Sequence, residues 1–122
     1  MRTFFVEIPV FKSHVYVVTG CSWEQYASHM KRKWNIDDDF SYLEKSDATA
    51  QTFDGEPYRS IWLQSFKGKP YDYGVLAHEA THCAIRICEN KGIPVDSWKT
   101  ADETCAYLVD YIVSEIIKKH RK

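Results

Sequence analysis

The chain has 122 residues and a mass of 14.3 kDa, which suits a single domain over 1–122 and excludes two ordinary ones. Its 44% hydrophobic and 15% aromatic residues exclude a disordered chain, because they suffice for a packed core. Sixteen Lys and Arg against seventeen Asp and Glu leave a net charge of −1, which argues against a dedicated nucleic-acid binder and against attraction to an anionic membrane.

We expect no targeting or membrane segment. The apolar start over 1–9 is interrupted by Glu7 and Pro9 and lacks a small-residue cleavage site, so it does not resemble a signal peptide. No apolar run approaches the roughly eighteen residues of a membrane helix. The four cysteines form no CxxC pair, so we expect reduced thiols and a cytoplasmic protein.

The first third of the chain predicts strand, turn, strand and helix. Residues 2–11 and 15–19 are rich in Phe, Val and Ile, as in two strands joined by a hairpin connection. Ser22 can cap a helix over 23–34, whose apolar residues recur at helical spacing.

The remainder predicts two further strands and then two long helices. Residues 48–53 form a possible strand and 59–66 another, and the stretch 68–70 (Gly-Lys-Pro) should break the chain. Helical patterns follow over 73–90 and 101–119. Early strands and late helices predict a small α+β domain, in which a small mixed or antiparallel sheet with a covering helix precedes the two long helices.

Residues 78–82 are His-Glu-Ala-Thr-His, an HExxH pattern within the first long helix. Positions four apart share one helical face, so His78 and His82 can point at one metal ion. Glu79 is rotated by about 100°, which suits it to contact a water on that ion. The pattern would arise by chance in about one shuffled sequence in a hundred, and the plain alternative is two surface histidines on an ordinary helix.

Two histidines leave a catalytic zinc site incomplete, because such sites usually have three protein ligands and a water. Glu103, at the start of the second long helix, is the candidate for the third ligand, and Asp102 is its rival. The competing interpretation is a capping box, in which Thr100 caps the helix and Glu103 folds back onto it. The helical wheel favours a ligand, since Glu103 shares its side with Ala106 rather than with a charged face.

The HExxH pattern followed about twenty residues later by a Glu that opens a second helix resembles the gluzincin branch of zinc metallopeptidases. The strings Leu-Ala-His-Glu-Ala-Thr-His (76–82) and Asp-Glu-Thr-Cys-Ala-Tyr-Leu (102–108) also resemble small zinc peptidases encoded by bacteriophages. The resemblance covers about 74–113 and implies a minimal zincin-like domain that binds one Zn²⁺. It also implies a sheet packed on the active-site helix and an edge strand that holds extended substrate, for which 59–66 is the candidate.

Carried over position by position, the resemblance implies His78, His82 and Glu103 as zinc ligands and Glu79 as general base. The larger gluzincins commonly have an Asp one turn beyond the ligand Glu, where this chain has Tyr107. Asp110 is the nearest acid on that side and could orient a histidine instead. Tyr107 is also our candidate oxyanion stabiliser, ahead of three other side chains: Tyr71, Tyr73 and His120.

The expected function is that of a zinc-dependent metallopeptidase, which hydrolyses an amide bond of a protein or peptide with a metal-activated water and Glu79 as base. If the chain is phage-encoded, it would act in the host cytoplasm. One alternative is a zinc-stabilised binding or regulatory module that keeps the fold without useful turnover. Another is a nucleic-acid-associated zincin, based on the basic runs 31–33 and 118–122. Two histidines and a carboxylate also suit other metals such as iron.

Overall fold

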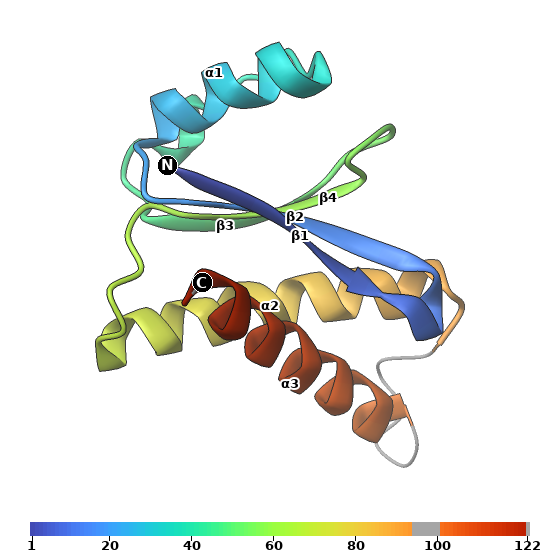
Figure 1. Ribbon diagram of the computed structural model, residues 1–122. Helices are drawn as coiled ribbons and strands as arrows, with labels where there is room; N and C mark the ends of the chain where they lie inside the picture. The colour runs from blue at the N-terminus through green and yellow to red at the C-terminus, as the bar shows by residue number, and fades with distance from the viewer. Residues whose placement is uncertain (94–100, 122) are drawn as a thin grey trace.

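The structure is a computed structural model that describes residues 1–93 and 101–121, the side chains of 101 and 102 excepted. These residues form an α+β fold in which a four-stranded mixed sheet lies between helices on both faces (Figure 1). In chain order the elements are β1 (Arg2–Ile8), the short 3-10 helix η1 (Pro9–Phe11), β2 (Ser13–Thr19), α1 (Trp23–Trp34), a second 3-10 helix η2 (Ser41–Leu43), β3 (Ala48–Thr52), β4 (Arg59–Leu63), α2 (Pro70–Asn90) and α3 (Ala101–His120).

The sheet order is β1-β2-β4-β3, which differs from the order along the chain. β1 and β2 form the expected antiparallel hairpin, β4 joins β2 in parallel, and β3 closes the sheet antiparallel to β4. The expectation that 59–66 forms the edge strand is therefore wrong. All five residues of β4 are buried because the strand lies between two others, and β3 is the edge on that side.

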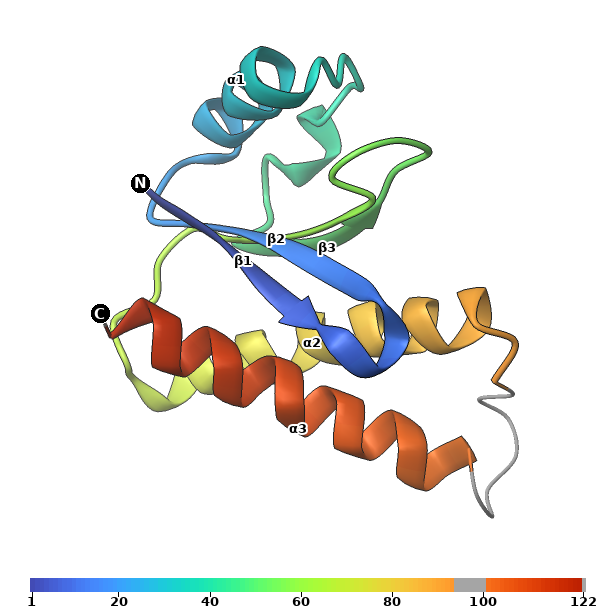
Figure 2. The ribbon, with the colours of Figure 1, turned by 45° about the vertical axis from the view of Figure 1, so that its right-hand side comes forward.

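Two cores lie on the two faces of the sheet, and β4 contributes to both by the alternation of its side chains. Ile61 and Leu63 pack with α2 and α3, whereas Trp62 packs with α1 and donates from Nε1 to the carbonyl of Cys21 at 3.0 Å. Trp62 is fully buried and belongs to the core. α1 covers one face, and α2 and α3 lie side by side on the other (Figure 2).

α1 begins and ends as its sequence predicts. The Ser22 hydroxyl accepts from the backbone N–H of Gln25 at 3.1 Å, and the Gln25 side chain accepts from the N–H of Ser22 at 2.8 Å. This reciprocal capping box satisfies two of the unpaired donors at the helix start. Asn35 ends the helix in the left-handed conformation with a φ of 56°.

α2 begins three residues before the expected Tyr73. Pro70, expected to break the chain, occupies the first turn of the helix, where its fixed φ suits the helix and its missing N–H is no loss. The Asp72 carboxylate accepts from the backbone N–H groups of Lys67 and Lys69 at 2.8 and 3.0 Å. These bonds lower the pKa of Asp72 and fix the entry to the helix.

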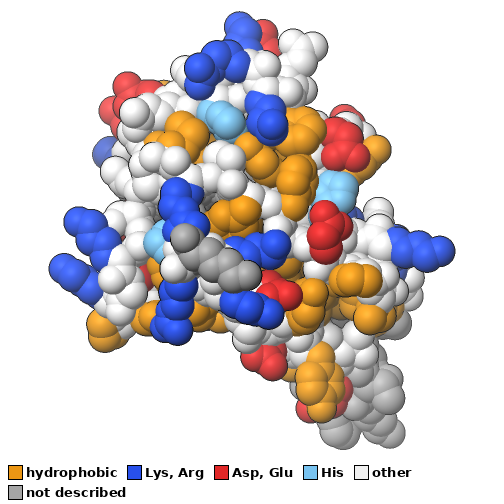
Figure 3. All heavy atoms as spheres, in the orientation of Figure 1, with side chains coloured by type: hydrophobic (Ala, Val, Ile, Leu, Met, Phe, Trp, Pro, Cys, Tyr) orange, Lys and Arg blue, Asp and Glu red, His pale blue; other side chains and the backbone are white. Residues whose placement is uncertain are grey.

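The surface and the cysteines agree with the composition. On the face seen in Figure 3, side chains of both charge signs occur among hydrophobic and uncharged ones. Cys21, Cys83, Cys88 and Cys105 are free thiols, and the first three are buried. Within the described residues, none of the helices has the length and apolar character that crossing a membrane requires.

Candidate metal centre

The HExxH residues lie in the middle of α2, on the side that faces β3. His78 and His82 are exposed, and their Nε2 atoms lie 3.2 Å apart, with the ring planes at 80°. Two zinc–nitrogen bonds of about 2.05 Å at the tetrahedral angle would place two nitrogens about 3.4 Å apart. The spacing of the two imidazoles therefore fits a single shared ion.

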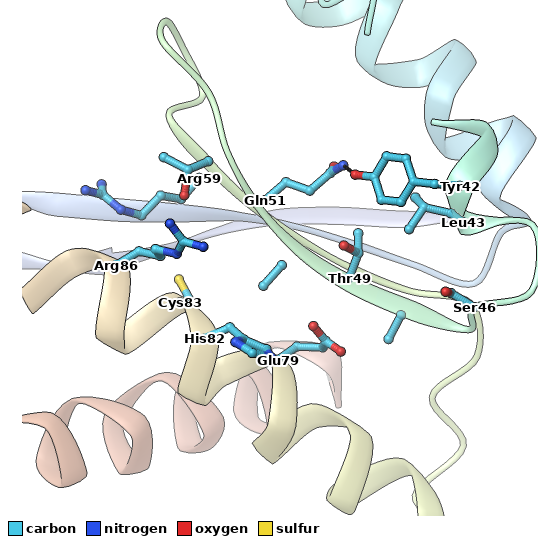
Figure 4. Close-up of a pocket in the computed structure, with 13 residues that line it drawn as sticks. Tyr42, Leu43, Ser46, Thr49, Gln51, Arg59, Glu79, His82, Cys83 and Arg86 are labelled. Atoms are coloured by element: carbon cyan, nitrogen blue, oxygen red, sulfur yellow. Dashed lines mark hydrogen bonds between the residues drawn. The ribbon is translucent and has the colours of Figure 1, made fainter. Parts of the chain in front are cut away.

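Glu79 is the buried member of the motif, with 9% of its surface exposed. Burial raises the pKa of its carboxyl, the neighbouring His78 and His82 lower it, and the charge of Asp47 raises it. The net effect is to raise the pKa of Glu79. The carboxylate points into the space between α2 and β3 (Figure 4), so the helix presents a base in a partly dry environment beside the two imidazoles.

A pocket of about 320 Å³ runs from Glu79 and His82 along the underside of β3. The strand contributes Ala48 and Ala50, whose small side chains leave room above α2. The further lining comes from η2, from β4 and from the next turn of α2, including Tyr42, Leu43, Arg59, Cys83 and Arg86. The pocket therefore connects the edge strand with the HExxH helix.

A second hollow meets the motif from its other side. Asp47, directly before β3, lines it together with His78 and Glu79. The Tyr71 hydroxyl donates to the Asp47 carboxylate at 2.6 Å and holds it on this side of the helix. Asp47 and Tyr71 are contributed by separate segments, 24 residues apart in sequence, and sequence reasoning gave Asp47 no role.

The structure does not bring Glu103 to the two histidines. α3 runs back along α2 in the opposite direction (Figure 2), and the thiols of Cys105 and Cys88 lie within hydrogen-bonding reach. Cys88 is six residues beyond His82, about 9 Å along the helix axis. Glu103 precedes Cys105, so it lies still further from His82, and its side chain is exposed.

No group of three His, Cys, Asp or Glu side chains suitable for a metal ion occurs among the residues that the structure describes. The described part of the protein thus supplies two ligands that fit zinc and leaves the third position open. Two residues of the competing interpretations cannot be placed at the site. Thr100, the expected cap, and the side chain of Asp102, the rival ligand, lie outside the described residues.

Tyr107 and Asp110 lie away from the motif. Tyr107 is 69% exposed and lines a shallow hollow with Val10, Phe11 and Asp110, between η1 and α3. Asp110 accepts from the Ser114 hydroxyl at 3.4 Å rather than from a histidine. The structure therefore brings neither the expected oxyanion stabiliser nor the expected orienting acid to the site, because α3 turns this side away from α2.

The sequence analysis assigned no role to two arginines that line the pocket, although the sequence position of each indicates the face on which it lies. Arg86 follows His82 by four residues and so shares the face of the two histidines. Arg59 alternates with Ile61 and Leu63, which places it on the face of β4 that packs toward α2.

Comparison of the chain with protein-family models, with curated proteins and with solved structures gave no match.

Proposed function

We propose that the protein is a zinc-dependent metallopeptidase with a zincin-like centre on α2. The observation that carries the proposal is the arrangement of the motif: two exposed imidazoles with Nε2 atoms 3.2 Å apart, next to the buried carboxylate of Glu79. Within the described residues Glu79 forms no ion pair, and burying such a carboxylate costs stability, so a chance pair of surface histidines does not account for it.

In this proposal His78 and His82 hold the metal through Nε2. Bound zinc would polarise the carbonyl of the substrate and lower the pKa of water. Glu79 accepts a proton from the attacking water and returns it to the leaving amine. Its position beneath β3 keeps bulk water from competing for that proton.

The substrate would lie along β3. An edge strand offers unpaired main-chain N–H and C=O groups, with which an extended peptide can pair as an additional strand. β3 is the edge on the α2 side, and its Ala48 and Ala50 face the pocket that leads to Glu79. This assigns to Ala48–Thr52 the role that the sequence analysis expected of 59–66.

The test separates metal binding from catalysis. Glu79→Gln should lower peptide hydrolysis by at least about a hundredfold, the usual contribution of a general base, and should retain one zinc per chain. His78→Ala and His82→Ala should each lower the zinc content. Zinc is measured by elemental mass spectrometry and hydrolysis with a fluorogenic peptide library.

His14→Ala is the matched control, because this ring pairs with Glu56 and packs on Phe5 at a distance from α2. Normal zinc content in both α2 histidine variants would overturn the site. Full zinc content with no cleavage of any library member would instead favour a zinc-stabilised binding or regulatory module.

A further inference from the structure

The pocket that begins at Glu79 and His82 contains two guanidinium groups at its other end. Arg59 reaches it from β4 and Arg86 from α2 (Figure 4). Both groups are positively charged at any physiological pH. Two positively charged side chains that line the same pocket favour a negatively charged partner.

Arg59 is the unusual member of the pair because it is buried, with 9% of its surface exposed. Its Nη1 donates to the Ser13 hydroxyl at 3.0 Å, and its Nε, also buried, has no hydrogen-bond partner among the described residues. Within those residues no carboxylate lies close enough to form an ion pair with it. A buried cation without a counter-charge lowers the stability of the fold, unless a bound ligand supplies the negative charge and the missing hydrogen-bond acceptor.

No neighbouring side chain of the described structure neutralises the pair. Arg86 is exposed and makes no ion pair with a described carboxylate.

We propose that Arg59 and Arg86 form a subsite for a carboxylate of the substrate, either an Asp or Glu side chain or a C-terminal carboxylate. The fork of a guanidinium matches the two oxygens of a carboxylate, and both arginines line the same pocket. That the carboxylate belongs to a peptide rests on the proposed function. The protein would therefore select peptides that present a carboxylate at this position.

The spacing on α2 indicates where the carboxylate lies in the peptide. Arg86 is four residues beyond His82 and eight beyond His78, so it lies about 9 Å along the helix axis from the centre of the pair. An extended peptide advances about 3.3 Å per residue. The carboxylate should thus be about three residues from the bond that is held at the two histidines.

The inference is tested by binding, in a protein that cannot turn over its ligand. Short fluorescein-labelled peptides with capped ends, identical except for a central Glu or Gln, are titrated into zinc-loaded Glu79→Gln protein and followed by anisotropy. A third peptide carries Gln and a free C-terminal carboxylate, which distinguishes the two sources of the anion. We expect one of the carboxylate peptides to bind about tenfold more tightly than the capped Gln peptide, as for a charge-assisted hydrogen bond.

Adding Arg86→Gln should reduce this preference to about twofold or less, and Arg32→Gln, an exposed arginine on α1, should leave it unchanged. Arg86 is exposed, so its variant should fold, which circular dichroism verifies. Arg59→Lys keeps the charge but loses the fork, and should reduce the preference in part.

Equal binding of all three peptides, or a preference that persists in Arg86→Gln, overturns the subsite. Failure of the proposed function gives a different result: a carboxylate preference that depends on Arg86, in a protein whose wild type cleaves no peptide. Cleavage by the wild type without any carboxylate preference would support the proposed function and contradict the proposed subsite.

Discussion

Glu79 weakens the fold that contains it. Burial raises the pKa of its carboxyl above the value in the unfolded chain, so the folded protein binds the proton more tightly. The stability that this proton confers is fully present below the unfolded pKa of about 4.3 and is lost as the pH rises through the higher folded value. At neutral pH the ionised carboxylate is therefore a net cost to the zinc-free protein.

We expect zinc-free Glu79→Gln to have a higher Tm than the wild type at pH 7, by on the order of a few degrees. The difference should shrink as the pH falls toward 4, because both side chains are then uncharged. Thermal unfolding in the presence of a chelator measures it, with Glu89→Gln, an exposed glutamate of α2, as the control. A lower Tm for Glu79→Gln at pH 7 would contradict the assigned cost.

At the scale of elements, α1 is separated from the candidate site by the sheet. Its packing partners are Trp62 and the other members of the core on that face, whereas the motif lies on the opposite side. Changes to the cap of α1 should therefore affect stability and leave the proposed metal site intact.

Ser22→Ala removes the hydroxyl that accepts from Gln25 and should cost about 1 kcal/mol of unfolding free energy. Urea denaturation measures the loss, and zinc binding should not change. Ser28→Ala is the control, because this exposed serine lies within α1 and its side chain has no part in the cap. A matching loss of zinc affinity in Ser22→Ala would show that α1 and α2 are coupled through the sheet.

At the scale of the whole molecule, the carboxylates near the proposed metal site depend on how three segments meet around α2. Asp47 lies before β3, lines a hollow with His78 and acts electrostatically on Glu79. Glu103 is on α3, and it lies further from the motif than the contact between Cys105 and Cys88. Under the proposed function, Asp47 would act on a bound metal through its charge and not as a third ligand, because it forms no three-residue metal group with the two histidines.

Asp47→Asn should accordingly weaken zinc binding by about tenfold or more, and Glu103→Gln should have a much smaller effect. Competition with a chromophoric zinc chelator gives both affinities, and Asp54→Asn, in the turn between β3 and β4, controls for the loss of one negative charge. The reverse ranking would indicate that the zinc-bound protein places α3 as the resemblance to gluzincins implies.

Features that depend on neighbouring residues could be predicted from the sequence. Features that depend on contacts between distant segments could not. Ser22 and the apolar spacing after it predicted α1, and the four-residue spacing of His78 and His82 placed both rings together, because each depends on neighbouring turns of one helix. The edge position of β3 could not be predicted, since it results from the parallel pairing of β2 with β4, two strands that are distant in the sequence. The distance of Glu103 from the motif depends on the packing of α3, which no spacing within the chain determines.

The free edge of β3 has a consequence for the protein in solution. Its sequence, Ala-Thr-Ala-Gln-Thr, contains no charged residue and no proline, the devices by which exposed strands usually resist pairing with other chains. A strand that pairs with an extended peptide, as proposed here for β3, needs its main-chain groups free, and a proline would remove one of the donors. The same edge therefore favours strand-to-strand association of two copies at high concentration, and a bound peptide would suppress it by occupying the site of contact.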